Sequence, residues 1–283
     1  MNTNNTALGG SPAYHYAMVV PCYNEETRFP ATDFGRFLDA NSNTLLCLVN
    51  DGSKDKTLEA LKHFQSLYPS KVEVLNLQKN SGKSEAVRSG INHIFNNFRN
   101  IGLIGFLDAD LATKPEEWVL MANYLDEHSR YGAIVGSRIP RLGADIERKD
   151  NRSVLSNIVK TFIRLILRTN FQDTQCGAKI FHRSLVPSLF GSNFNTPWLF
   201  DVEIFMRLKK KFGGNSLRKG VLEYPLLYWS EIGDSKLKLK DSVRIPLQLL
   251  MMYFQYNWSD KFKTKSGYSI FDKKHGLMLK NYN

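Results

Sequence analysis

The chain has 283 residues, of which 42% are hydrophobic and 23% are charged, and its formal net charge is +11. This composition is typical of one large folded domain and excludes a disordered chain; the three scattered cysteines exclude a disulfide framework or a zinc site. Residues 201–283 hold 16 basic and 8 acidic side chains, which favours an anionic partner such as a membrane surface, a phosphorylated substrate or nucleic acid.

The first fifteen residues are polar and rich in glycine. They lack the basic start and apolar centre of a secretory signal peptide. We therefore expect residues 1–15 to be a flexible leader and the protein to be cytoplasmic.

Four short apolar runs alternate with helical patterns in the first 107 residues. The runs at 16–21, 45–50, 72–77 and 101–107 predict strands, and the apolar spacing within 57–67 and 84–98 predicts helices. A further strand is expected at 133–137. Strands that alternate with helices predict an α/β fold, with a mostly parallel sheet and helices on both faces.

Polar residues follow each of these strands. In open α/β sheets, ligands bind beyond the carboxyl ends of the strands, so the residues after each strand are the candidates for chemistry. The segments concerned are 21–26, 50–55, 80–83 and 108–110. We expect their polar groups to converge on one edge of the sheet.

Asp108 and Asp110 are the candidate metal ligands. Two carboxylates at a strand end suit Mg²⁺ or Mn²⁺ bound together with substrate phosphates, although an isolated Asp-x-Asp also occurs as a simple helix cap. Asp51 offers a carboxylate to a nucleotide base; the alternative is that its segment only forms the turn and N-cap of the helix expected at 57–67. Lys83 opens a helix, where a lysine and backbone N–H groups suit phosphate.

Two apolar stretches stand apart in the second half of the chain. Residues 153–168 read as an amphipathic helix, and residues 245–254 are the most apolar run. Ten residues cannot cross a hydrocarbon core of about 30 Å, so we expect no membrane span there. Burial in the core, a dimer interface and docking on a membrane surface remain open for both.

Eight ordered motifs resemble the family 2 glycosyltransferases of the GT-A (Rossmann-like) fold, and most closely the dolichyl-phosphate β-glucosyltransferases and mannosyltransferases. They are VVPCYNEE, VNDGSKDKT, NSGKSEAVRSG, DADLATKP, GSR, DTQCGAKIF, FDVEI and SEIGDSK. The resemblance covers residues 16–240 and leaves 241–283 as a basic, amphipathic C-terminal helical appendage. It implies a metal-dependent, inverting transfer of a hexose from a nucleotide sugar, UDP-glucose rather than GDP-mannose, to a polyprenyl phosphate such as dolichyl or undecaprenyl phosphate.

On the donor side, the resemblance implies roles for residues in the first four motifs. The nucleotide pocket would be lined by Pro21, Tyr23, Asn24, Glu25 and Asp51, with Lys83 and Arg88 near the donor. Asp108 and Asp110 would bind the metal and the diphosphate. Asn50 stands where the family usually has a first Asp, and this departure leaves Asp51 intact.

On the acceptor side, the resemblance implies that Arg138 faces the sugar or the acceptor phosphate and that an acid at Asp201 or Glu203 faces the sugar. The acceptor loop would contain Gln175, Cys176 and Gly177. The segment closing over the site would contain Trp229, Glu231, Ser235 and Lys236. Asp110, Arg138, Asp201 and Glu203 are thus the candidate catalytic residues.

Two alternatives stay open at this point. A transferase acting on a soluble or cell-surface glycan would need a general base, for which Asp201 and Glu203 are candidates. A non-catalytic nucleotide-binding module would not need both Asp108 and Asp110. A nucleic-acid partner is not expected, because no recognition motif accompanies the basic C-terminal third. We expect peripheral contact with the inner face of a membrane, and the sequence leaves a homo-oligomer open.

Overall fold

The computed structural model describes residues 14–147, 171–197, 199–213, 217–230, 241–257, 268–272 and 276–281, with residues 161, 163, 164 and 167. The helices are α1 (Ala31–Ala40), α2 (Thr57–Leu67), α3 (Lys83–Asn97), α4 (Pro115–Glu127), α6 (Val186–Phe190), α7 (Phe200–Phe212), α8 (Leu217–Gly220) and α9 (Asp241–Asn257). The strands are β1 (Tyr16–Cys22), β2 (Thr44–Asp51), β3 (Val72–Leu77), β4 (Leu103–Phe106), β5 (Ala133–Ser137), β6 (Asp145–Glu147), β7 (Lys179–His182), β8 (Val221–Pro225), β9 (Tyr228–Ser230), β10 (Tyr268–Asp272) and β11 (Gly276–Asn281).

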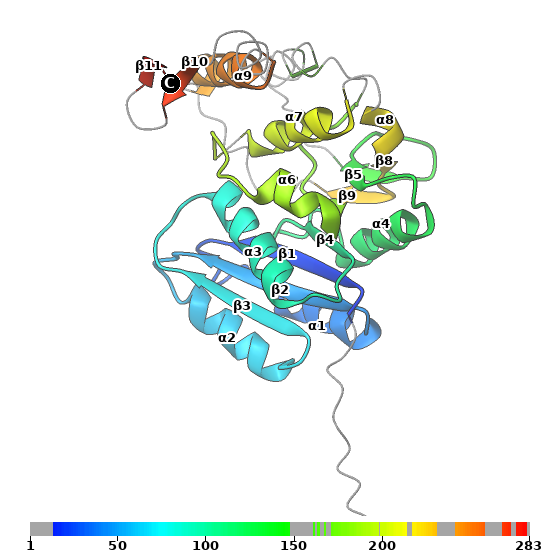
Figure 1. Ribbon diagram of the computed structural model, residues 1–283. Helices are drawn as coiled ribbons and strands as arrows, with labels where there is room; N and C mark the ends of the chain where they lie inside the picture. The colour runs from blue at the N-terminus through cyan, green and yellow to red at the C-terminus, as the bar shows by residue number, and fades with distance from the viewer. Residues whose placement is uncertain are drawn as a thin grey trace, which may run out of the picture.

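Seven of the described strands form one sheet in the order β3-β2-β1-β4-β7-β5-β8. Strand β7 is antiparallel to both of its neighbours, and every other pairing in this sheet is parallel. Helices cover both faces (Figure 1). One core cluster packs α3, α6 and α7 against the sheet, and the other packs α1, α2 and α4 against the opposite face. The predicted α/β fold with a mostly parallel sheet is confirmed.

The predicted elements agree closely with the observed ones in the first half of the chain. The bounds of β3, β5 and α2 are as predicted, and those of β1, β2 and α3 differ by one residue at an end or at both ends. The fourth strand is shorter, because Ile101 closes the turn that follows α3 and the pairing with β1 runs only from Leu103 to Phe106.

Helix α7 was not predicted as a helix, and its burial explains why. Residues 201–208 are all buried, so polar Asp201, Glu203 and Arg207 lie inside the protein together with apolar neighbours. A helix that is buried around most of its circumference lacks the apolar and polar stripes by which an amphipathic helix is recognised.

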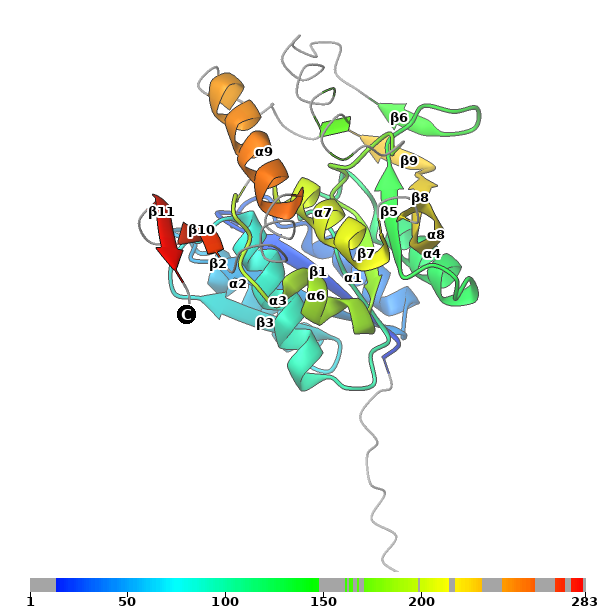
Figure 2. The same ribbon diagram turned by 45° about the horizontal axis from the view of Figure 1, so that its top comes forward.

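The structure can be compared with the expected domain boundaries at residues 15 and 240. Tyr14, which the sequence placed in the leader, is 7% exposed and packs in the core. The run at 245–254 lies within α9, which packs against α7 (Figure 2). Most of 153–168 lies outside the described residues, and the division at residue 240 stays a prediction. Within the described part of the chain, no helix is long and apolar enough to cross a bilayer.

Candidate active site

The loops that follow β1 and β2 are joined by hydrogen bonds. The backbone N–H of Asn24 donates to Ser53 Oγ at 3.1 Å, and the N–H of Lys54 donates back to Asn24 Oδ1 at 3.0 Å. Glu25 N–H donates to Thr57 Oγ1 at 2.7 Å. Asn24 has a positive φ of 52°, a conformation that asparagine tolerates better than most residues. These bonds fix the predicted pocket segment around Tyr23, which is 39% exposed.

Asp51 joins this region to the loop between β3 and α3. Its carboxylate is 3% exposed and accepts the N–H groups of Ser81 at 2.8 Å and Gly82 at 2.9 Å. Burial raises the pKa of Asp51, although the two N–H groups favour the ionised form. Gly52 has φ +60°, and a Cβ there would lie 2.3 Å from the backbone nitrogen of Asn80. Asp51 therefore holds this loop, whether or not it also contacts a base.

Lys83, the first residue of α3, reaches the end of β4. Its Nζ lies 2.6 Å from Asp108 Oδ1. Burial by itself lowers the pKa of Lys83, but the carboxylates of Asp108, Asp201 and Asp110 outweigh it and raise the pKa. Arg88 lies further along the same helix and forms an ion pair with Glu85 at 2.6 Å. We call Asp51, Ser81, Gly82, Lys83 and Asp108 the strand-end cluster.

Asp108 and Asp110 border a cavity of about 110 Å³ that Arg138, Gly177 and Trp229 also line. Gly177 passes so close to Asp108 that a Cβ on it would lie 2.2 Å from Oδ2. Only glycine permits this approach of the backbone to the carboxylate. The cavity thus brings together Asp108, Asp110 and Arg138 with one residue of the predicted acceptor loop, Gly177, and one of the predicted closing segment, Trp229.

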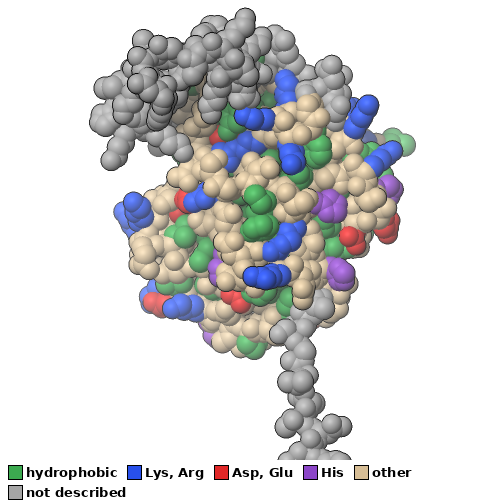
Figure 3. Space-filling view, viewed as in Figure 1, with side chains coloured by type: hydrophobic (Ala, Val, Ile, Leu, Met, Phe, Trp, Pro, Cys, Tyr) green, Lys and Arg blue, Asp and Glu red, His purple; other side chains and the backbone are tan. Residues whose placement is uncertain are grey.

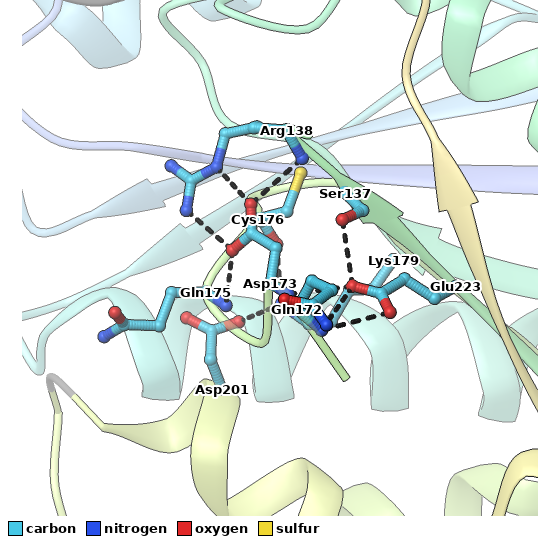
Figure 4. Close-up of polar contacts among 9 residues, drawn as sticks. All are labelled: Ser137, Arg138, Gln172, Asp173, Gln175, Cys176, Lys179, Asp201 and Glu223. Atoms are coloured by element: carbon cyan, nitrogen blue, oxygen red, sulfur yellow. Dashed lines mark hydrogen bonds and ion pairs between the residues drawn. The ribbon is translucent and has the colours of Figure 1, made fainter. Parts of the chain in front are cut away.

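Arg138 is held in this cavity by Asp173. Its Nε and one terminal nitrogen lie 2.6 and 2.8 Å from the two carboxylate oxygens, and its backbone N–H donates to Asp173 Oδ2 at 3.1 Å (Figure 4). Burial by itself raises the pKa of Asp173, but the guanidinium outweighs it and holds this pKa well below the usual range. The guanidinium also lies 5.2 Å from the centre of the Trp229 ring. Arg138 is therefore oriented by a carboxylate and an aromatic ring.

Glu223 of β8 supports Asp173 from behind. Its carboxylate accepts the Ser137 hydroxyl at 2.9 Å and the N–H groups of Gln172 and Asp173, each at 2.8 Å (Figure 4). These bonds fix the backbone of Asp173 to β5 and β8, and the side chain of Asp173 in turn holds Arg138.

Lys179 and Asp201 form a second buried pair. Lys179 Nζ lies 2.6 Å from Asp201 Oδ1 and donates to the carbonyl of Cys176 at 2.6 Å. Burial raises the pKa of the Cys176 thiol to about 11, so it stays protonated near neutral pH. We call Arg138, Asp173, Lys179, Asp201 and Glu223 the ion-pair cluster.

Glu203 lies apart from this cluster. Successive helical residues are rotated by about 100°, so Asp201 and Glu203 face different sides of α7. The Glu203 side chain is fully buried, lies 2.8 Å from an Arg207 nitrogen and accepts the Tyr256 hydroxyl at 2.7 Å. We therefore do not retain Glu203 as a catalytic residue; it ties α9 to α7. Two other predicted residues, Glu231 and Lys236, lie outside the described residues, as does Ser235.

The donor set at Asp108 and Asp110 fits a divalent cation bound together with phosphate. Hard carboxylate oxygens suit Mg²⁺ or Mn²⁺, which take one or two carboxylates and complete their coordination with water and substrate phosphates. Among the described residues, no three His, Cys, Asp or Glu side chains form a group able to hold a metal. Asp108 and Asp110 line one cavity, where phosphate from a bound substrate would complete the coordination of the ion.

Sequence reasoning missed Asp173, Lys179 and Glu223 as site residues. The first two lie within the DTQCGAKIF motif, so the signal was present although only the middle of the motif was assigned a role. Glu223 stands in a short strand with no motif around it. Its part in the site depends wholly on the pairing of β8 with β5.

Residues 17–190 match the model of the family described as glycosyl transferase family 2. The chain is 31% identical over 281 residues to dolichyl-phosphate beta-glucosyltransferase ALG5C of Trichomonas vaginalis, covering 93% of this chain and 79% of the relative. It is 29% identical over 260 residues to dolichyl-phosphate beta-glucosyltransferase of Saccharomyces cerevisiae, covering 85% and 74%.

Solved structures show the same fold at low sequence identity. Glucosyl-3-phosphoglycerate synthase from Mycobacterium tuberculosis, in complex with Mn²⁺ and UDP-glucose, aligns with a TM-score of 0.61 at 12% identity, covering 95% of this chain and 86% of that one. Because the family match spans more than half of the chain and agrees with this fold, the chain belongs to glycosyltransferase family 2, with the GT-A fold.

Proposed function

We propose that the protein transfers glucose from UDP-glucose to a polyprenyl phosphate, such as dolichyl or undecaprenyl phosphate, with inversion at the anomeric carbon. The observation that carries this proposal is the distribution of charge around the cavity. Asp108 and Asp110 line this cavity together with Arg138, whose guanidinium is fixed by Asp173. The names of the relatives, which are dolichyl-phosphate beta-glucosyltransferases, supply the donor sugar and the acceptor class.

On the donor side, we assign Asp108 and Asp110 to a Mg²⁺ or Mn²⁺ ion that would neutralise the departing diphosphate. The solved neighbour with Mn²⁺ and UDP-glucose supports this assignment through its shared fold. Asp51 fixes the loop before α3, so Lys83 starts that helix at a defined place beside Asp108. Lys83 would bind the diphosphate once the donor replaces its contact with Asp108.

On the acceptor side, Arg138 suits a phosphate because a guanidinium offers several N–H donors in one plane. Asp173 orients that plane and Trp229 lies against it. A phosphate monoester is already anionic near neutral pH, so its oxygen attacks without a strong base. Asp201 is held by Lys179, which supports a role in orienting the sugar rather than in moving toward an acceptor hydroxyl.

We also propose that α9 contacts the surface of a membrane, where a polyprenyl phosphate would be presented. One side of the helix packs into the core through Ile245, Leu249 and Met252. Leu247, Leu250, Met251 and Phe254 are 37% to 53% exposed at helical spacing. The chain as a whole carries a net charge of +11, and on the described part of the face in Figure 3 basic side chains outnumber acidic ones, which would favour anionic lipid.

A panel of donors and acceptors tests the reaction. UDP-glucose, UDP-galactose and GDP-mannose are each offered with dolichyl phosphate, undecaprenyl phosphate and a soluble glycan, with Mn²⁺, with Mg²⁺ or with EDTA. We expect glucosyl transfer to a polyprenyl phosphate that EDTA abolishes. Transfer to the soluble glycan alone would instead support the glycan-acceptor alternative.

Vesicle sedimentation tests the membrane contact separately. We expect salt-sensitive binding to vesicles that contain anionic phospholipid, and weaker binding when Leu250 and Phe254 are both replaced by Ser. Equal binding by this double variant and the wild type would contradict the role of α9.

A further inference from the structure

Lys179 is a fully buried lysine at the centre of the ion-pair cluster. Its side chain is 0% exposed, and its ammonium lies 2.6 Å from Asp201 Oδ1 and 2.6 Å from the Cys176 carbonyl oxygen. Fully buried lysines are rare, and a buried ion pair seldom adds stability over apolar residues of the same size. Packing alone therefore does not account for a charged residue here.

The contacts of Lys179 connect three parts of the structure. Lys179 begins β7, Cys176 lies in the turn before that strand, and Asp201 lies in the first turn of α7 (Figure 4). The residue after Cys176 is Gly177, whose backbone passes against Asp108. The ammonium of Lys179 thus holds both the Asp201 carboxylate and the Cys176–Gly177 turn, whose backbone passes against Asp108.

The first turn of α7 also lies near the strand-end cluster, since Lys83 Nζ is 5.9 Å from the centre of the ring of Phe200, the residue before Asp201. If the contact with Lys179 is lost, the Asp201 carboxylate loses the ion pair that fixes its position in this turn. The buried lysine therefore determines where this carboxylate lies.

We propose that Lys179 is a positioning residue, whose ammonium holds the Asp201 carboxylate and the Cys176–Gly177 turn in place beside Asp108. The proposal rests on the proposed function, in which Asp201 orients the donor sugar. Lys179 contacts neither substrate nor metal in this scheme, and it acts through Asp201.

The test compares Lys179→Met, Asp201→Asn and the double variant with the wild type. Methionine keeps the length of the side chain and removes the ammonium. The double variant removes both charges, so it avoids the unpaired buried carboxylate that could unfold Lys179→Met. The matched control is Lys71→Met, because Lys71 also donates to backbone carbonyls, those of Leu38 and Asn41, at the far side of the domain.

We expect Lys179→Met and Asp201→Asn each to lower kcat at least tenfold, and the double variant to lower it no further than the larger single loss. The double variant should unfold at a higher temperature than Lys179→Met. Lys71→Met should keep kcat within twofold. The proposal would be overturned if the fold losses in kcat of the two single variants multiplied in the double variant. It would also be overturned if kcat stayed within twofold of the wild type for Lys179→Met or for a folded double variant.

A binding measurement tests the positioning role without depending on the identity of the acceptor. Affinities for UDP and for UDP-glucose are measured with Mn²⁺ and without acceptor. We expect the double variant to bind UDP as the wild type does and UDP-glucose about tenfold more weakly. Equal retention of both affinities would overturn the positioning role, whereas absence of transfer to polyprenyl phosphate by the wild type would contradict only the proposed function.

Discussion

The strand-end cluster and the ion-pair cluster each contribute one residue, Asp108 and Arg138, to the same cavity, but different interactions hold them. In the first, a buried carboxylate, Asp51, accepts backbone N–H groups from a neighbouring loop. In the second, Arg138 pairs with Asp173 and Lys179 with Asp201, and Glu223 fixes the backbone of Asp173. The first cluster combines one ion pair, Lys83 with Asp108, with a carboxylate that holds backbone N–H groups, whereas the second is held by two ion pairs between side chains.

This difference predicts how each cluster responds to change. Removal of the Asp51 carboxylate leaves the N–H groups of one loop without their acceptor, so the first cluster should respond with weaker donor binding and a moderate loss of stability. A buried ion pair leaves an uncompensated charge when one partner is removed, so damage to the second cluster should spread to stability and pH dependence. The variants below test that contrast, from the largest expected effect to the smallest.

Asp110→Asn should have the largest effect, because it removes a charge that we assign to the metal while keeping the size of the side chain. We expect transfer to fall by at least about 10²-fold. Asp110 is exposed, so the unfolding temperature should stay unchanged. Asp33→Asn, at another exposed acid in α1, serves as the control in a metal-dependent transfer assay. Retention of most activity by Asp110→Asn would contradict the metal assignment.

Gly177→Ala acts where the two clusters meet. The added Cβ would lie 2.2 Å from Asp108 Oδ2, so the turn or the carboxylate must move. We expect turnover to fall about tenfold or more and the Mn²⁺ concentration for half-maximal rate to rise. Gly102→Ala is the matched control, because a Cβ there meets no atom within 4 Å. An equal response of both variants would show that the approach to Asp108 does not matter.

Asp51→Ala tests the strand-end cluster alone. It removes the acceptor of the Ser81 and Gly82 N–H groups, so the loop before Lys83 should loosen. We expect KM for the nucleotide sugar to rise about tenfold and the free energy of unfolding to fall by roughly 1–3 kcal/mol. KM for the acceptor should not change. A rise in acceptor KM of the same size would mean that the clusters are not separable.

Asp173→Asn makes the converse change in the ion-pair cluster. The amide cannot hold both donors of Arg138, so the guanidinium loses its fixed orientation. We expect KM for the acceptor to rise about tenfold, equivalent to about 1.4 kcal/mol, with KM for the donor within twofold. Steady-state kinetics with each substrate varied in turn measures the split. A change confined to donor KM would place Arg138 on the donor side.

Acid titration should show the smallest effect. The ordinary pKa of aspartate is about 3.9, and Arg138 holds the folded-state pKa of Asp173 well below it. The ion pair therefore stabilises the fold fully above the ordinary value, and this contribution is lost as the pH falls toward the lowered pKa. Below about pH 5, the free energy of unfolding should fall less steeply for Asp173→Asn than for the wild type. Parallel curves from chemical denaturation would contradict this.

The difference between the clusters also explains which parts of the site the sequence could predict. Asp51, Lys83 and Asp108 each follow, or lie shortly after, a strand with a clear apolar pattern, and parallel strands bring such ends to one edge. Asp173 and Glu223 are about 50 residues apart and meet only because β8 pairs with β5 beyond the antiparallel β7. No local pattern signals such a contact. Glu203 shows that a motif can also mislead. Its motif suggested a place in the site, but Glu203 points to another side of α7 than Asp201 and contacts Asn195 and Tyr256.

The sequence by itself determined the alternation of strands and helices, the convergence of polar strand ends and the membership of the family, because these depend on local periodicity and ordered motifs. The tertiary structure alone decided the partners of Arg138 and Asp201, the approach of Gly177 to Asp108, and the burial of Lys179. The physical reason is that a buried charge needs a partner, and for Arg138 and Lys179 that partner comes from another segment of the chain. That pairing is fixed by the order of the strands in the sheet and not by the neighbours of either residue in the chain.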